Sequence, residues 1–514
     1  MDVHAPVSAD DPAYPAAEVP PASSQRAWLP PLVAVVGFLA FCAVVLSREV
    51  AMLEPDDSSY RAALVALTQG HWLLTDEQYR ALSAQLGQIM QWTQLPSGLW
   101  TTEKNPGYVL LAYPFQALGV LRLAPLFYGA IGCVGLYTGG RRWLGRWGGT
   151  WTVLAFLFSG AAIAFAWRPT MPTFTDAALV AAGTGGLLWA LLATDRTARA
   201  RVVGGSLAVL AFDLAVLARY TNIVVLVVAV VAVLATYRRA GLAFRHVAWW
   251  LGLVALLIAV MLGYGAVVYG SATGSGYGSG VITFSLAAIG PNLAGMPGLL
   301  LRAMPVMVVA LAGLVWIGAR YLRHGVDAAD VAERTRDLVV GGFLAAGWFA
   351  LWAVYAAYDW TAQMLGGGRP GGGFPGGGPG GGPGAGQGGS AVVVPASLPS
   401  APADPGLPGD PGPGLPDGGL PGGGFPGGGP GSLGDAGIHV IRFYVPVIGL
   451  VALLAAFTLS RLPRWWLSAA VVVVLVVLAY LSADRLVATP ALAGRGGFGV
   501  GPVTQGPIDQ GPGG

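Results

Sequence analysis

This sequence contains very little charge. Of its 514 residues only 10% are Asp, Glu, Lys or Arg, whereas soluble domains carry about a quarter. Hydrophobic residues make up 54% of the chain, and its mean hydropathy is +0.63. The shortage of charge excludes a string of soluble domains. The formal net charge is only +3, so we expect no nucleic-acid partner.

Cysteine is scarce as well. The two cysteines, Cys42 and Cys133, lie inside apolar runs, where a free cysteine is ordinarily a small buried hydrophobe. They indicate neither a disulfide framework nor a redox compartment. The first 25 residues lack Lys and Arg, so they do not look like the basic start of a signal peptide. We expect residues 1–27 to form a disordered cytoplasmic tail.

Long apolar runs, by contrast, recur along the whole sequence. A helix of about 17 or more such residues crosses about 30 Å of hydrocarbon. Strand-like alternation of comparable extent is missing, so we predict an all-α polytopic membrane protein. Eleven membrane helices are expected, at residues 29–49, 123–140, 150–167, 175–193, 203–218, 221–236, 247–269, 299–319, 338–358, 440–460 and 466–482.

The arginines predict the orientation of these helices. With the N-terminus in the cytoplasm, five short cytoplasmic loops hold fifteen of the twenty-seven arginines. The apolar stretch 108–119 is then interpreted as a helix lying in the outer interface, because counting it as a span would reverse the loops that follow. The outer loop 50–122 is predicted to contain further amphipathic helices, one of them capped by Thr75 and Gln78.

Glycine and proline dominate residues 359–438. The segment lacks the strict three-residue period of collagen. It also cannot bury enough apolar surface to fold, so we expect a disordered outer loop. A transmembrane core at 28–358, with the outer loop 50–122, would precede it. Two C-terminal membrane helices at 439–483 would follow it, and 484–514 would be a disordered outer tail.

A small set of ionisable residues lies near the predicted outer ends of the helices. Charges beside hydrocarbon are costly and are usually paired or functional. Three arginines at helix ends, Arg168, Arg219 and Arg442, run against the positive-inside trend, and an anionic ligand such as a lipid phosphate would explain them. The set is Glu54, Asp56, Asp57, Arg61, Glu103, Lys104, Arg168, Asp176, Arg219 and Arg442.

Lys104 is the only lysine in the chain. In a sequence so rich in arginine, a retained lysine suggests that a compact ammonium group matters there. Lysine binds phosphate as a point charge, whereas arginine presents a planar fork. The following residues, Asn105-Pro106-Gly107, favour a turn. This turn would present Glu103 and Lys104 just before the interfacial helix.

The order and sidedness of these motifs resemble the GT-C glycosyltransferases. A first helix is followed by the acidic pair Asp56-Asp57, by Glu103-Lys104-Asn105-Pro106, and then by short hairpins that carry Arg and Asp. Within the superfamily the pattern is most similar to the protein O-mannosyltransferases and lipid A aminoarabinose transferases. The resemblance covers residues 30–240 and 439–460.

The resemblance implies roles for several residues. The acidic pair would supply the catalytic carboxylate, and Lys104 would contact the donor phosphate. Asp176 would match an acidic residue of a hairpin, while Arg442 and Tyr444 would match a late Arg-x-Tyr motif. The family more often has Asp-Glu and Lys-Pro-Pro, so the Asp-Asp pair and Asn105 depart from its pattern, and either Asp56 or Asp57 could match the catalytic residue.

We therefore expect a membrane glycosyltransferase. It would move a sugar, with inversion, from a polyprenyl-phosphate-linked donor to a lipid, polysaccharide or protein acceptor on the outer face of a bacterial cytoplasmic membrane. Lys104, Arg219 and Arg442 would stabilise the leaving phosphate. The supporting residues would be Glu103, Arg61, Arg168, Asp176 and Tyr444.

Two points stay open at the level of sequence. Either Asp56 or Asp57 would take the proton of the acceptor hydroxyl, or the two together would hold a divalent metal cation. The alternative to a transferase is a transporter or lipid flippase. Such proteins usually place their ionisable residues near the middle of the bilayer, whereas the charges considered above lie at the outer rim.

Overall fold

The computed structural model describes residues 27–50, 55–87, 89–274, 276, 283–322, 328–365 and 440–488. Several predicted features lie outside these residues. They are the tail 1–26, Glu54, the part of the Gly/Pro-rich loop from 366 to 438, and the tail from 489 onward. Of the predicted loop 359–438, the structure describes only residues 359–365. Most of these residues form the short helix α14 (Asp359–Met364).

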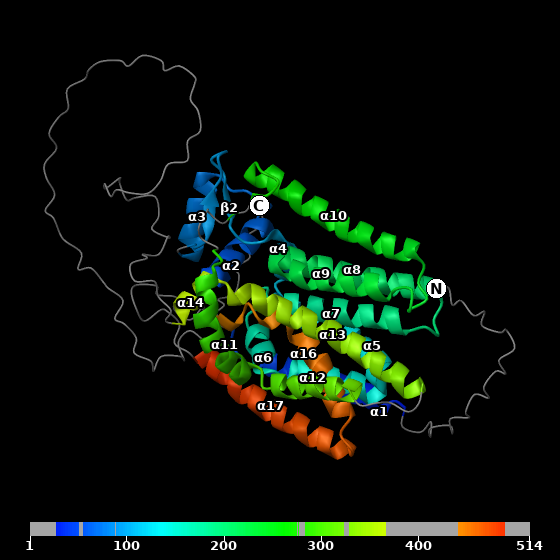
Figure 1. Ribbon diagram of the computed structural model, residues 1–514. Helices are drawn as coiled ribbons and strands as arrows, with labels where there is room; N and C mark the ends of the chain where they lie inside the picture. Colours follow the sequence, from blue (N-terminus) through cyan, green and yellow to red (C-terminus); the bar gives the residue numbers. More distant parts are fainter. Residues whose placement is uncertain are drawn as a thin grey trace, which may run out of the picture.

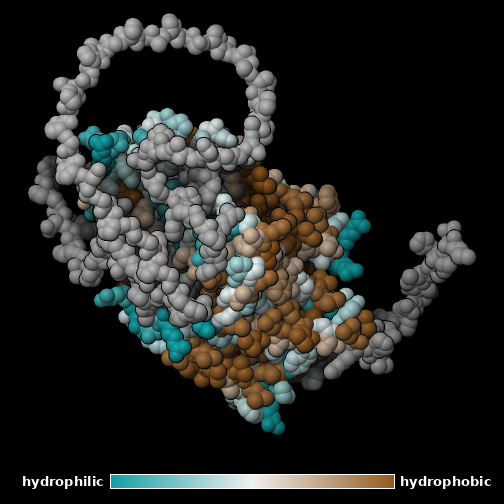
Figure 2. Space-filling view, turned by 60° about the vertical axis from the view of Figure 1, so that its left-hand side comes forward, coloured by the Kyte–Doolittle hydropathy of each residue, from teal (hydrophilic) through white to brown (hydrophobic). Residues whose placement is uncertain are grey.

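The described residues build a bundle of long helices with a smaller lobe at one end (Figure 1). Seven helices are long and apolar enough to cross a membrane, or eight if one bent pair is counted as a single span. Figure 2 shows a broad hydrophobic surface with hydrophilic residues gathered toward its edges. The chain is thus an all-α polytopic membrane protein in a lipid environment. The bundle consists of α1 (Leu29–Leu46), α5 (Leu123–Leu157), α6 (Gly160–Ala166), α7 (Thr173–Leu192), α8 (Ala198–Ala218), α9 (Ile223–Thr236), α10 (Phe244–Tyr269), α11 (Ile289–Ala303), α12 (Val306–Leu322), α13 (Ala328–Ala356), α16 (Ile448–Ser460) and α17 (Trp465–Ala488).

Helix α5 is a hairpin of two arms. Gly145 has φ 82° and ψ −176°, a combination outside the helical region and essentially restricted to glycine. A Cβ atom on Gly149 would lie 2.6 Å from the carbonyl oxygen of Tyr137. In a straight helix twelve residues span about 18 Å, so the second arm must fold back on the first.

Two predicted helices are broken, and the prediction of continuous helices there is wrong. The predicted helix 150–167 consists of the second arm of α5 followed by α6, with Ser159 capping α6 through its hydroxyl. The predicted helix 299–319 is split into α11 and α12, which meet at 106°. Pro305 lies between them, and proline removes a backbone donor and disfavours the helical conformation of the residue before it. The count of eleven membrane helices stays a prediction.

Close packing of α5 against α7 fixes the centre of the bundle. A Cβ atom on Gly135 would lie 2.6 Å from the Cα atom of Ala182, and Gly132 packs in the same way on Ala178. Such small residues let membrane helices approach closely and gain van der Waals contact. Helix α7 is almost entirely buried as a result, and its first turn carries Asp176.

The smaller lobe lies at one end of the bundle, where Figure 1 shows α2, α3 and β2 close together. It consists of α2 (Pro55–Thr68), α3 (Asp76–Leu86), the antiparallel strands β1 (Trp92–Gln94) and β2 (Trp100–Thr102), and α4 (Pro106–Ala117). The predicted capping of α3 by Thr75 and Gln78 is confirmed, whereas the two strands were not predicted. A separate core that includes Tyr60, Leu64 and Tyr108 holds the lobe together. We call this end of the bundle the site end.

Candidate active site

Three carboxylates at the site end pair with basic side chains from distant parts of the chain. The Asp56 carboxylate lies between two cations, with its Oδ1 atom 2.7 Å from Lys104 Nζ and its Oδ2 atom 3.2 Å from Arg442 Nη1. Asp176 Oδ2 lies 2.7 Å from Arg219 Nε. The third pair joins Asp57 to Arg168. The structure therefore places seven of the predicted site residues in direct ion pairs: Asp56, Asp57, Lys104, Arg168, Asp176, Arg219 and Arg442.

The cluster of Asp56, Lys104 and Arg442 combines three separate elements. Asp56 lies in the first turn of α2, where the helix dipole favours a carboxylate. Lys104 follows β2 directly, and Arg442 precedes the short 3-10 helix Val445–Val447. The side chain of Asp56 is 13% exposed and that of Lys104 only 4%. This cluster is therefore nearly closed, with Asp56 on its more open side.

The environment of Asp56 keeps its carboxyl group ionised. Burial would raise its pKa, but the charge and hydrogen bond of Lys104 oppose this effect. A hydrogen bond from the side chain of Gln91 and the charge of Arg219 add to the opposition, so the pKa lies below its ordinary value. At neutral pH Asp56 is thus an anion that holds two cations in place.

The neighbouring Asp57 has a different set of partners. Successive helical residues point about 100° apart, and Asp57 faces Arg168 while the hydroxyl of Thr170 donates to its Oδ1 atom at 2.7 Å. Both side chains of the ion pair are almost completely buried. The acidic pair therefore does not act as one unit, and the geometry assigns Asp57 to the packing of α2 on the hairpin before α7.

The two carboxylates also bear on the predicted metal site. Both oxygens of Asp56 and both oxygens of Asp57 already have protein partners. In the part of the chain that the structure describes, no group of three or more His, Cys, Asp or Glu residues could hold a metal ion. A divalent cation at Asp56 would have to displace Lys104 or Arg442.

Arg219 links the end of α8 to the start of α7 and to the backbone at Arg442. Its guanidinium group binds Asp176, donates to the hydroxyl of Thr173 at 3.0 Å, and donates to the carbonyl oxygen of Arg442 at 3.0 Å. Burial alone would lower the pKa of Arg219, but the charge of Asp176 more than reverses this. Arg219 therefore fixes the backbone at Arg442, and its charge reaches Asp56 from a distance.

Aromatic rings surround Arg442. Its guanidinium carbon lies 4.8 Å from the ring centre of Phe443 and 5.2 Å from that of Trp360, which belongs to α14. These are cation–π distances. Tyr444 is buried and contacts Trp352 and Tyr355 of α13. Tyr355 in turn contacts Phe443, so Tyr444 belongs to the same group of packed aromatic rings as the ring beside Arg442.

The last two predicted site residues, Glu103 and Arg61, lie outside these ion pairs. Glu103 is half-buried and forms no ion pair with any described residue. Burial raises its pKa, the charge of Lys104 opposes that shift, and the charge of Asp56 adds to it. Arg61 lies one turn further along α2 and forms no ion pair within the described ranges. The structure thus does not join Arg61 to the other charges.

Sequence reasoning missed Gln91, Thr170 and Thr173. Gln91 is the only described residue other than glycine with positive φ, at 58°, and such residues often mark functional or strained sites. Its carbonyl oxygen accepts from the N–H of Glu103 at 2.9 Å, while its side chain bonds Asp56. Nothing in the local sequence signals this conformation. The two threonines could have been noticed, because they alternate with prolines beside Arg168.

Asp213 was also missed, and it lies within a membrane helix. It is 7% exposed in α8, and its Oδ1 atom has no hydrogen-bond partner in the described structure. It lines an apolar groove of about 360 Å³ between α8 and α10. The sequence had suggested that the ionisable residues outside the cytoplasmic loops lie at the rim of the bundle. Asp213 is an exception, because it lies within a membrane helix. The carboxylate would be costly there in its charged form.

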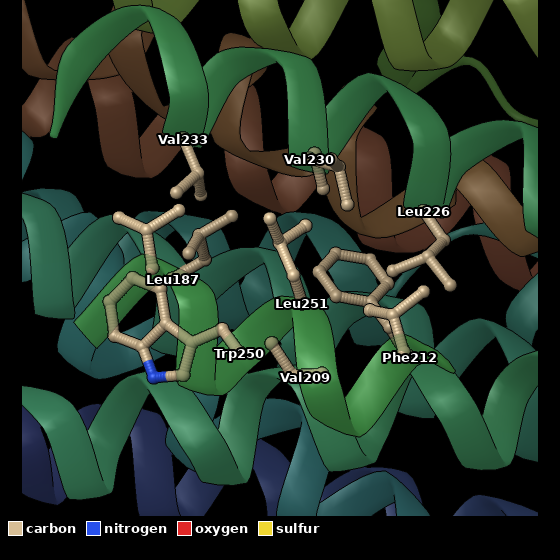
Figure 3. Close-up of a pocket in the computed structure, with 11 residues that line it drawn as sticks. Leu187, Val209, Phe212, Leu226, Val230, Val233, Trp250 and Leu251 are labelled. Carbon is tan, nitrogen blue, oxygen red and sulfur yellow. The ribbon is translucent and has the colours of Figure 1, made fainter. Parts of the chain in front are cut away.

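A second cavity lies nearby and is unlike the groove. Figure 3 shows Leu187, Phe212, Leu226 and Trp250 around it, and its volume is about 20 Å³. All of its lining residues are hydrophobic. A space of this size holds one water at most, and apolar cavities stay dry. It is a packing defect between α7, α8, α9 and α10.

Comparisons of the chain with protein-family models, with curated proteins and with solved structures find no match. The functional interpretation therefore depends on the residues of this chain and on their geometry.

Proposed function

We propose that the chain is a GT-C-like membrane glycosyltransferase that takes its sugar from a polyprenyl-phosphate-linked donor. One observation carries this proposal. Asp56, Lys104 and Arg442, which come from three distant segments, meet with separations of 2.7 and 3.2 Å at one end of an apolar bundle. Lys104 and Arg442 are cations that can bind phosphate oxygens, so their meeting at Asp56 suits the phosphate of a lipid-linked sugar.

The path of the chain supports a site on the outer face. Counting both arms of α5, together with the short helices α9 and α16, the chain would cross the membrane eleven times. With a cytoplasmic N-terminus, the turn at Gly145 would face the cytoplasm, together with the pair formed by Arg142 and Asp195. The site end would then lie on the outer side, and α4 would lie in the outer interface.

In the proposed reaction the hydroxyl oxygen of the acceptor attacks the anomeric carbon of the donor sugar from the side opposite the phosphate. The carbon–oxygen bond to the phosphate breaks, and the electron pair leaves with the lipid phosphate. Lys104 and Arg442 would stabilise the charge that develops on it. Arg219 would act indirectly, because it holds the carbonyl group of Arg442. The acceptor is a lipid, a polysaccharide or a protein.

The test uses the purified full chain in proteoliposomes with radiolabelled polyprenyl-phosphate hexoses and pentoses. Lys104→Met and Arg442→Met should each lower transfer at least tenfold, because each removes a cation from the phosphate site. Arg80→Met is the matched control. Arg80 lies on α3, and its side chain is 78% exposed. Equal activity in all three variants would contradict the proposal.

The buried carboxyl group of Asp213 favours a transporter or lipid flippase as the second candidate. An ionisable residue within a membrane helix is a sign of a transport path. If this second function holds, Asp213→Asn should stop the movement of a labelled lipid across proteoliposomes. If the chain is a transferase, the same variant should keep its sugar transfer.

A further inference from the structure

We infer that Glu103 is the base that takes the proton of the acceptor hydroxyl, and that Asp56 is a positioning residue that holds Lys104 and Arg442. This inference rests on the proposed sugar transfer. It departs from the expectation that the acidic pair of α2 supplies the base. The argument comes from the partners of each carboxylate at the site end.

The carboxylates of the ion pairs are poor bases. Asp57 is sealed between Arg168 and Thr170, so an acceptor hydroxyl could not approach it without unpacking the core. Each oxygen of Asp56 faces a cation, and protonation of Asp56 would weaken the hold on both cations. Asp176 lies fully buried against Arg219. A base must instead be able to gain and lose a proton while the phosphate-binding groups stay in place.

Glu103 meets this requirement. It is next to Lys104 in the chain, so it lies beside the proposed donor phosphate, and it forms no ion pair with the described residues. It is half-buried, which leaves a face from which an acceptor could arrive. Among the described residues it is therefore the acid of this cluster whose proton can move without breaking an ion pair.

The backbone of Glu103 is held on two sides. Its N–H donates to the carbonyl oxygen of Gln91, which also accepts from the hydroxyl of Ser59 at 3.2 Å. On the other side Gly276 packs so closely that a Cβ atom there would lie 2.5 Å from the Cα atom of Glu103. The side chain of Gln91 bonds Asp56. One strained residue thus ties the proposed base to the carboxylate that positions the cations.

The electrostatics agree with this division of work. A general base is most effective when its pKa lies near the working pH. Burial and the charge of Asp56 raise the pKa of Glu103 against the opposing charge of Lys104, while the pKa of Asp56 is lowered. During transfer the hydroxyl proton would pass to the Glu103 carboxylate as the new carbon–oxygen bond forms. The resulting carboxylic acid would return its proton to water after the products leave.

The experiment compares wild type, Glu103→Gln and Glu103→Asp in the full chain in proteoliposomes, with the labelled polyprenyl-phosphate sugars as donors. Glu103→Gln should lower kcat by a factor of about 100 or more and leave KM for the donor within twofold. It should also remove the fall of kcat/KM on the acidic side of the pH profile. Glu103→Asp should restore part of kcat and part of that acidic limb.

Two further outcomes separate the claims. If wild type transfers sugar and Glu103→Gln keeps the wild-type pH profile and kcat, Glu103 is not the base, although the proposed function stands. If wild type turns over none of the donors while a fluorescent polyprenyl phosphate still binds, the proposed transfer fails and this inference fails with it. The midpoint temperature of thermal unfolding of Glu103→Gln should equal or exceed that of wild type. This result would exclude loss of the fold as the cause of lower activity.

Discussion

Removal of the Arg168 side chain should destabilise the protein strongly, whatever the function of the chain. Asp57 and Arg168 have side chains that are 1% and 0% exposed. In Arg168→Met the carboxylate of Asp57 would stay buried and would lose the guanidinium group that neutralises it, while it kept the hydroxyl bond from Thr170. Breaking a buried ion pair by removing one partner costs about 3–5 kcal/mol. We therefore expect the free energy of unfolding to fall by that amount.

The double variant Asp57→Leu/Arg168→Met gives the decisive comparison. Replacing both partners by apolar groups removes the unpaired charge, so this variant should regain most of the loss. The assay is equilibrium unfolding in mixed detergent micelles, with Arg80→Met as the control for an exposed pair worth about 0.3–0.5 kcal/mol. If Arg168→Met costs no more than Arg80→Met, or if the double variant is as unstable as the single one, the reasoning is wrong.

Three further predictions test separate parts of the structure. The pKa of Asp56 is lowered in the folded state, so its ion pairs stabilise the protein above the ordinary Asp pKa of about 4. This stability is lost as the pH falls further, and unfolding of Asp56→Asn measured across pH 2–6 should lack that dependence. Asp213→Leu should raise the free energy of unfolding by up to about 3 kcal/mol, because it removes an ionisable group from a membrane groove; a loss of stability in the detergent assay would reveal a partner. Gly145→Ala should cost about 1–3 kcal/mol, because its φ of 82° suits only glycine. Gly252→Ala, in the open middle of α10, should cost nothing in the same assay.

The sequence predicted the class of the fold well because hydrophobic length is a local property. Helices such as α7 and α9 begin and end within two residues of their predicted bounds. The bend at Pro305 and the break at Ser159 were missed, because an average over a long apolar window hides single residues. The averaging also hid Asp213, a lone carboxyl group among leucines.

The candidate site was only partly predictable. The predicted outer location and the charge of Asp56, Lys104 and Arg442 marked them as site residues. The structure brings these three together. The division of the acidic pair depends on where α2 starts, since the helix turns the two carboxylates to different partners. The role of Gln91 depends on its positive φ, and no pattern in the neighbouring residues predicts that conformation. Ion pairs between residues hundreds of positions apart, such as Asp56 and Arg442, depend on how the helices pack. Local sequence patterns do not predict that packing.

The most direct test of the central claim is sugar transfer by the purified full chain from a radiolabelled polyprenyl-phosphate sugar, measured for wild type and for Lys104→Met. We predict that wild type moves the label to an acceptor and releases the polyprenyl phosphate, while Lys104→Met keeps its fold and loses at least nine-tenths of this activity. Transfer at the wild-type rate by Lys104→Met would contradict a phosphate site at Asp56, Lys104 and Arg442.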